Sequence, residues 1–119
     1  MDFPLEKLPD AIAARADTWT RAALVWQTRP VSPNHGTATI ISDFESEAWM
    51  GTVIIWATGE TEFQSIRLAD DRIINKHYDL CGPEDLDRMM TEIATLIADN
   101  HIPPGAIEAD WVPQGQPNS

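Results

Sequence analysis

The feature that most constrains this chain is a series of short apolar segments separated by connections of only a few residues. Four segments form the series: residues 37–44, 49–57, 61–68 and 72–79. They are rich in β-branched and aromatic residues, which favour strands. Thr58-Gly59 and Asp70-Asp71 mark tight turns between them. Connections this short join antiparallel neighbours, because a parallel pair needs a crossover of about a dozen residues. The sequence therefore predicts an antiparallel meander.

The second segment, residues 49–57, is apolar on both of its alternating faces. One face carries Trp49 and Ile55, and the other carries Ile54 and Trp56. A strand covered on both faces is usually central in its sheet. We therefore expect Trp56 in the core. Trp49, at the start of the strand beside acidic residues, fits either the core or an exposed anchor for a partner.

A helix is predicted before the meander. Apolar residues from Leu5 to Trp26 recur at intervals of three or four, which is the period of one helix face. Proline belongs in the first turn of a helix, so the regular helix should start near Pro9. Residues 22–29 fit either the end of this helix or a strand, and both interpretations stay open.

The clearest helix follows the meander. Gly82-Pro83 suits a helix start, and Glu84 and Asp85 fall in the first turn, where the helix dipole favours acidic residues. An apolar stripe continues to Ile97, and Pro103-Pro104 prevents the helix from resuming.

These elements predict an α+β fold: an antiparallel β-meander of four or five strands packed with an N-terminal and a C-terminal helix. One domain, residues 1–102, accounts for them. Residues 103–119 are rich in proline and glycine and are expected to form an irregular tail, which Trp111 could attach to the body.

No group of residues points to catalysis or to metal binding. His77 and Cys81 are the nearest pair of zinc-ligand types, while His35 and His101 are scattered. The chain has neither a nucleophile elbow nor a phosphate-binding glycine loop. We expect no enzyme activity, no metal and no cofactor.

Charge is the dominant feature of the composition. The net charge is −11, and residues 43–71 hold seven acidic residues against Arg67 alone. Such a chain is repelled by nucleic acid phosphates and by anionic membranes. A basic protein is its natural partner, although acidity that merely keeps the domain soluble is an alternative.

The sequence also predicts a cytoplasmic location. Its longest apolar runs are far shorter than the ~20 residues of a membrane helix. The first residues lack the pattern of a signal peptide. The single Cys81 excludes an internal disulfide and fits a reducing compartment.

Acidic residues at the turns are the candidate partner-binding residues. In a meander, alternate turns lie at opposite ends of the sheet, so one end should gather Glu45, Glu47, Trp49, Asp70 and Asp71. Glu60 should lie at the other end. A rival surface is the acidic start of the last helix, at Glu84, Asp85 and Asp87, which helix-dipole complementation explains equally well.

Several short motifs lie within residues 43–97. They are Glu45-Ser46, the run from Gly51 through Trp56 to Gly59-Glu60, Phe63, His77-Tyr78-Asp79-Leu80 and Glu84-Asp85-Leu86. In order and spacing they resemble the TriTu family of bacterial toxin-immunity proteins. This resemblance implies an antidote that binds and blocks a cognate toxin, and it implies no catalytic residues.

The resemblance and the charge together predict an immunity protein that neutralises a cognate toxin domain by protein–protein contact. The toxin is expected to be basic, as a nuclease would be. The alternative is an acidic secretion chaperone, which would bind an extended effector chain rather than a folded domain. The oligomeric state stays open.

Overall fold

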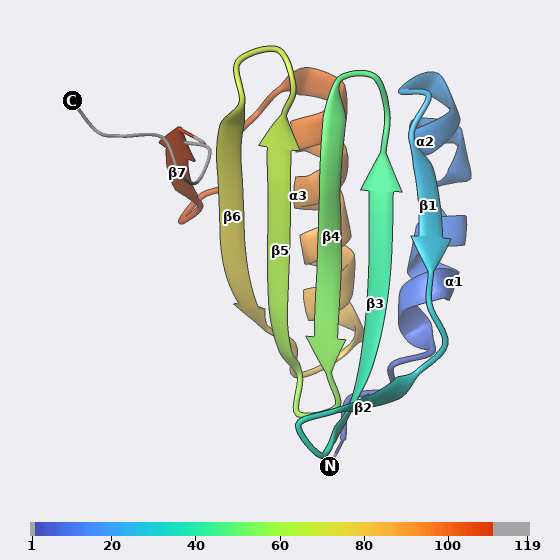
Figure 1. Cartoon of the computed structure of the whole chain (residues 1–119). Helices are drawn as coiled ribbons and strands as arrows, with labels where there is room; N and C mark the ends of the chain where they lie inside the picture. Colours follow the sequence, from blue (N-terminus) through green and yellow to red (C-terminus); the bar gives the residue numbers. More distant parts are fainter. Residues whose placement is uncertain (1, 111–119) are drawn as a thin grey trace, which may run out of the picture.

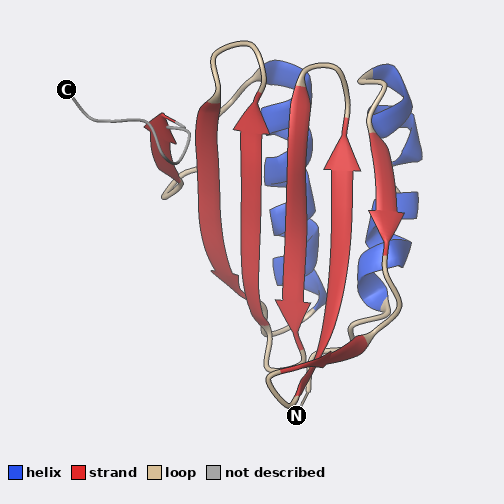
Figure 2. Cartoon of the chain, in the orientation of Figure 1, coloured by secondary structure: helices blue, strands red, loops and turns tan. Residues whose placement is uncertain are grey.

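The predicted meander forms the centre of an antiparallel sheet with helices on one side (Figures 1 and 2). The computed structural model describes residues 2–110. Its elements are α1 (Lys7–Ala13), α2 (Ala16–Arg21), β1 (Val25–Thr28), β2 (Ser32–Asn34), β3 (Thr37–Glu45), β4 (Trp49–Trp56), β5 (Glu60–Arg67), β6 (Arg72–Asp79), α3 (Pro83–Asp99) and β7 (Ile107–Asp110). The strand order is β1-β3-β4-β5-β6-β7, and β2 pairs with β3. The α+β prediction is confirmed, with three short strands added to the meander.

The N-terminal helix is divided in two between Ala14 and Arg15. Pro9 lies in the first turn of α1, as its geometry requires. The indole N–H of Trp19 in α2 donates to the carbonyl of Ile12 in α1, at 2.8 Å. Both short helices therefore keep their apolar residues on the same side of the molecule.

Residues 22–29, for which the sequence left two alternatives, contain a strand. Ala23 adopts a left-handed conformation (φ 53°), which ends α2 and reverses the chain. Trp26 in β1 then packs against Trp19, with ring centroids 5.3 Å apart, and against Phe44 in β3, at 4.9 Å. These aromatic contacts hold β1 at the edge of the sheet beside β3.

α3 covers the middle of the sheet. It starts at Pro83 and is closed by Asn100 in a left-handed conformation. Its apolar stripe is fully buried at Met89, Met90 and Ile93. The opposing sheet residues Val53, Ile55, Phe63 and Ile74 are also fully buried. The core therefore lies between this helix and strands β4 to β6 (Figure 1).

The opposite face of the sheet carries no helix among the described residues (Figure 2). Trp49 shares the helix-covered face with Val53 and is only 4% exposed, whereas Trp56 points to the other face and is half-buried. Our expectation of Trp56 in the core is therefore wrong. The apolar alternation reflects one covered face and one uncovered face, which antiparallel sheets tolerate.

The prediction of an irregular tail over residues 103–119 is wrong for four residues. Ile107–Asp110 is not irregular, since it forms β7 and pairs with β6. Arg72 on β6 bridges to Asp110 at 2.8 Å and to Glu108 at 3.5 Å, and the hydrogen bond that it donates to Asp110 raises the pKa of Arg72. Trp111 and the residues after it lie outside the described part of the chain. No helix within residues 2–110 is long and apolar enough to span a membrane.

Candidate protein-binding surface

The turns that carry the candidate acidic residues lie at two ends of the sheet (Figure 1). The β3–β4 and β5–β6 turns lie at the same end, and the backbone N–H of Leu68 donates to the carbonyl of Ala48, at 2.9 Å, between them. Glu45 and Glu47 therefore share an end with Asp70 and Asp71. The role of these residues in binding stays a prediction.

Glu45 and Glu47 present charge that the chain itself does not balance. Both are exposed, and neither has an ion-pair partner within residues 2–110. The hydroxyl of Ser46 accepts hydrogen bonds from the backbone N–H groups of Ala48 and Trp49, at 3.1 and 3.0 Å. These bonds shape the turn that holds Glu47 outward.

Asp70 and Asp71 differ from each other. Arg67 donates two hydrogen bonds to the carboxylate of Asp70, at 3.0 and 2.8 Å, and these bonds hold the pKa of Asp70 below its ordinary value. The same contact raises the pKa of Arg67, which also donates to Asn100 at the end of α3. Asp71 is exposed and completes the turn with φ 54°. The carboxylate of Asp71 is therefore more available to a partner than that of Asp70.

Trp49 does not contribute a contact surface. Its side chain is buried on the helix-covered face at the start of β4. The alternative of an exposed anchor is wrong, because the Trp49 side chain is only 4% exposed. Trp49 can support the neighbouring turn but cannot touch a partner directly.

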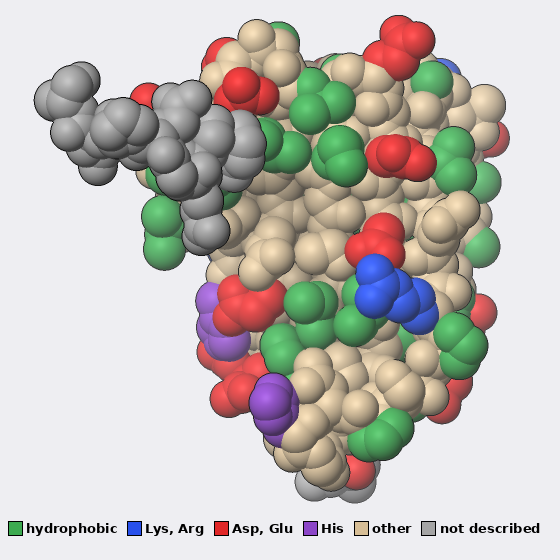
Figure 3. Space-filling view, viewed as in Figure 1, with side chains coloured by type: hydrophobic (Ala, Val, Ile, Leu, Met, Phe, Trp, Pro, Cys, Tyr) green, Lys and Arg blue, Asp and Glu red, His purple; other side chains and the backbone are tan. Residues whose placement is uncertain are grey.

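The helix-free face of the sheet, which we call the open face, exposes apolar side chains beside acidic ones (Figure 3). The strand register aligns one row across five strands: Val25, Glu45, Met50, Ile66 and Ile73. Val25 is 59% and Met50 47% exposed. Exposed apolar side chains grouped on one face are typical of a protein-binding surface.

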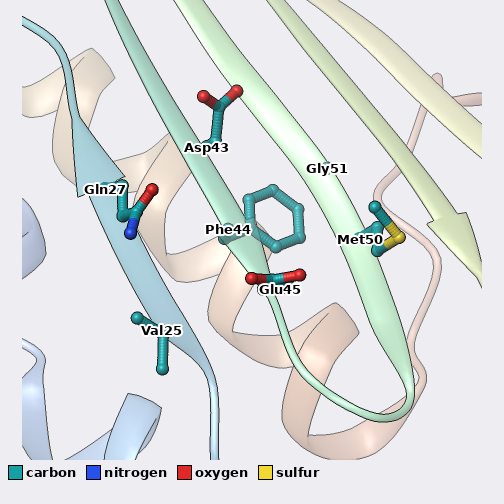
Figure 4. Close-up of a pocket in the computed structure, with 7 residues that line it drawn as sticks. All are labelled: Val25, Gln27, Asp43, Phe44, Glu45, Met50 and Gly51. Carbon is teal, nitrogen blue, oxygen red and sulfur yellow. The ribbon is translucent and has the colours of Figure 1, made fainter.

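A hollow of about 230 Å³ lies on this face around Glu45 (Figure 4). Val25 and Gln27 come from β1, Asp43 and Glu45 from β3, and Met50 from β4. Arg29 is paired with Asp43 at 2.7 Å. Glu45 thus lies between two exposed apolar side chains with its charge unbalanced.

Gly51 fixes the backbone beneath this hollow. Its helix-facing side is occupied by the ring of Phe44, which stacks in turn on Phe63 with centroids 5.9 Å apart. A Cβ atom at position 51 would collide with that ring and with the carbonyl oxygen of Gln64. Only glycine lets the ring cover β4 at this point.

Two further hollows adjoin the first. One, of about 750 Å³, shares Val25 and Glu45 with it and extends to Ala22 and Glu47. The other, of about 540 Å³, shares Met50 and Gly51 with it and extends to Ile66 and Ile73. We call the three together the groove. It runs from the β3–β4 turn across the open face to β6.

The sequence predicted the acidic residues of the groove but missed its apolar ones. Only β4 carried a signal, because its second alternating set, which contains Met50, Ile54 and Trp56, is apolar. We interpreted that set as buried, whereas it marks a surface. Val25, Ile66 and Ile73 lie in strands whose open-face residues are otherwise mostly polar, so no pattern singled them out.

At the other end of the open face, His77 lies between two carboxylates. One imidazole nitrogen is 2.7 Å from Glu62 and the other 3.0 Å from Asp79. Hydrogen bonding, first to Glu62 and then to Asp79, raises the pKa of His77. Within residues 2–110, no three metal-ligand side chains are grouped as a metal site would require.

Two of the three acidic residues at the start of α3, the rival surface, bind the chain's own groups. Asp85 accepts a hydrogen bond from the backbone N–H of Cys81 at 2.8 Å. Asp87 pairs with Arg15 at 2.9 Å. Glu84 is exposed. These contacts favour a structural role for Asp85 and Asp87.

Glu92, further along α3, is likewise engaged inside the fold. Lys76 and the Tyr78 hydroxyl both donate to the same oxygen of Glu92, at 2.7 Å each. Burial, with help from Glu92, raises the pKa of Tyr78. This acidic residue fastens α3 to β6 and is not available to a partner.

Comparison with known proteins gives one match. A family model described as "Immunity protein TriTu" matches residues 21–95. The matched region runs from the end of α2 into α3 and includes every strand that lines the groove. No curated protein and no solved structure matches the chain.

Proposed function

Because the chain belongs to the TriTu family of immunity proteins, we propose that it binds a cognate bacterial effector toxin and blocks that toxin by protein–protein contact. The observation that carries the proposal is the open face, where exposed Val25 and Met50 flank the unbalanced Glu45. Apolar contact gives a protein interface its free energy of binding, and charge selects the partner.

The toxin in this proposal is basic. Residues 43–71 contain seven acidic residues and a single arginine, and this imbalance of charge supports a partner of opposite charge. Long-range attraction would raise the association rate by about 10²- to 10³-fold at low salt. A nuclease toxin fits, because the lysines and arginines that hold nucleic acid phosphates also pair with carboxylates. Occupying those cations blocks the substrate without any catalysis by the inhibitor.

A complex between the purified chain and the toxin domain encoded next to its gene tests this function. Size-exclusion chromatography with light scattering should show a stable complex, and the toxin's activity should fall in proportion to added inhibitor up to saturation. Circular dichroism of the toxin before and after release should show that it was bound folded. Binding of the unfolded toxin chain alone would favour the secretion chaperone, and absence of binding would overturn the proposal.

A further inference from the structure

The groove has an acidic end. Its corner hollow is lined by Glu45 and Glu47 on one side and by Ala22 and Ala23 on the other. The alanine side chains are short, so a long side chain from a partner has room to reach both carboxylates. No cation among residues 2–110 balances them, and a lysine or arginine is therefore the complementary group.

The opposite end of the groove has an apolar row beside a polar one. Met50, Ile66 and Ile73 form the apolar row, and Gln64 and Asn75 lie in the next row of the open face. An aliphatic or aromatic side chain of a partner would be buried against the apolar row. Methionine adapts its shape to such an occupant at little cost.

The distance between the two ends limits what can occupy them together. Glu45 lies on β3 and Ile73 on β6, which are three strand spacings apart. At ~4.8 Å per spacing this is about 14 Å, the length of about four residues of a segment in extended conformation. One short segment of a partner can therefore reach both ends.

A second copy of this chain is a poor occupant. A symmetric pairing through the open face would bring like-charged patches together in two molecules that each carry a net charge of −11. Nucleic acid is disfavoured by the same acidic side chains.

We propose that the groove seats a single short segment of the toxin, in which a lysine or arginine that binds Glu45 and Glu47 lies within about four residues of an aliphatic or aromatic side chain that binds at Met50, Ile66 and Ile73. This inference rests on the proposed function and adds the binding surface and the chemistry of the partner's segment.

Filling the groove tests its apolar half. Gln64 is exposed on the open face of β5, so Gln64→Trp places a large ring in the groove at a strand position that tolerates aromatic residues. The matched control is Ser32→Trp, at an exposed position of β2 at the far end of the sheet. Binding of the toxin domain is measured by surface plasmon resonance, and the fold by circular dichroism and melting temperature. Gln64→Trp should raise the Kd at least about tenfold, whereas Ser32→Trp should leave it unchanged.

Neutralising Glu45 and Glu47 tests the acidic end of the groove. The double variant Glu45→Gln with Glu47→Gln, which we call the groove pair, removes two charges from the groove. Glu6→Gln with Glu60→Gln removes two charges from exposed positions elsewhere, so both proteins have the same net charge. The groove pair should speed dissociation at least about tenfold, whereas the control pair should change only the association rate. Hydrogen exchange of the wild-type complex should show that binding protects the amides of one toxin segment. That segment should contain a lysine or arginine close to an apolar residue.

Four outcomes would overturn the inference. If folded Gln64→Trp and the groove pair bind the toxin as tightly as the wild type, the groove is not the site, while the immunity function stands. If the protected toxin segment lacks a cation, the proposed chemistry is wrong. If the wild-type chain does not bind the toxin at all, the immunity function falls and this inference with it. Dimerisation of the free chain that Gln64→Trp abolishes would assign the groove to a second copy instead.

Discussion

At the scale of single residues, the two tryptophans of β4 have opposite roles. Trp49 lies in the core, and Trp56 lies half-buried on the open face. Trp49→Ala should therefore lower the free energy of unfolding by about 3–5 kcal/mol, the usual cost of removing a buried aromatic side chain. Trp56→Ala should cost clearly less, since solvent already reaches its ring. Urea denaturation of both variants measures the difference, and equal losses would mean that a second layer covers Trp56.

His77 should make stability depend on pH. Its folded pKa is raised above the ordinary value of 6.5 by Glu62 and then Asp79. Protonated His77 therefore stabilises the fold fully below pH 6.5, and that contribution is lost as pH rises through the raised pKa. Relative to His77→Gln, the wild type should gain stability as pH falls from about 8 to 6. The gain will be modest, because the three side chains are exposed.

An NMR titration of the imidazole checks the same prediction directly. The midpoint for His77 should lie above the ordinary value of 6.5, and Glu62→Gln should lower it. A midpoint for His77 at or below 6.5 would contradict the hydrogen bonds to Glu62 and Asp79.

At the scale of elements, the start of α3 is predicted to act in stability and not in binding. Asp85→Ala removes the acceptor for the Cys81 N–H and should cost about 1 kcal/mol of unfolding free energy. Glu84→Ala, at an exposed neighbouring position, should cost less because only the helix dipole is affected. Toxin affinity should be unchanged in both. Weaker binding by a fully stable Asp85→Ala protein would transfer the binding surface to this helix.

The elements that the sequence predicted correctly are those determined by local pattern. The meander follows from short turns, and α3 from its stripe and its proline start. β1 could not be decided, because Val25–Thr28 suits either structure and the contact of Trp26 with Phe44 settles it. β7 was missed, because Ile107–Asp110 forms a strand only through pairing with β6, far away in sequence.

In the candidate site, too, the sequence could predict what depends on local pattern but not what depends on tertiary packing. The grouping of Glu45 with Asp71 depends only on the alternation of turns in a meander, so the sequence could predict it. The groove depends on which face of the sheet α3 covers. Both alternating sets of β4 are apolar, so no pattern in that strand could tell the face of Met50 from the face of Val53.

At the scale of the whole molecule, the net charge of −11 should govern how fast the toxin is captured. Salt shortens the range of electrostatic attraction from about 10 Å at 0.1 M to about 3 Å at 1 M. The association rate should therefore fall steeply with salt, while dissociation changes less. Stopped-flow mixing across a salt series measures both rates. A flat association rate would remove electrostatic steering and leave the acidity to serve solubility.

The helix layer brings together segments that are far apart in the sequence, and this affects the order in which the chain can fold during synthesis. The backbone N–H of Phe3 donates to the carbonyl of Ala57 at 2.7 Å, and Arg15 binds Asp87 and Thr91 in α3. The meander can form from successive hairpins, whereas α1 can pack against α3 only after α3 has left the ribosome. Until then the face of the sheet that α3 covers in the folded protein is exposed to solvent. A chain whose translation stops before α3 should therefore expose the apolar residues of that face and be prone to aggregation.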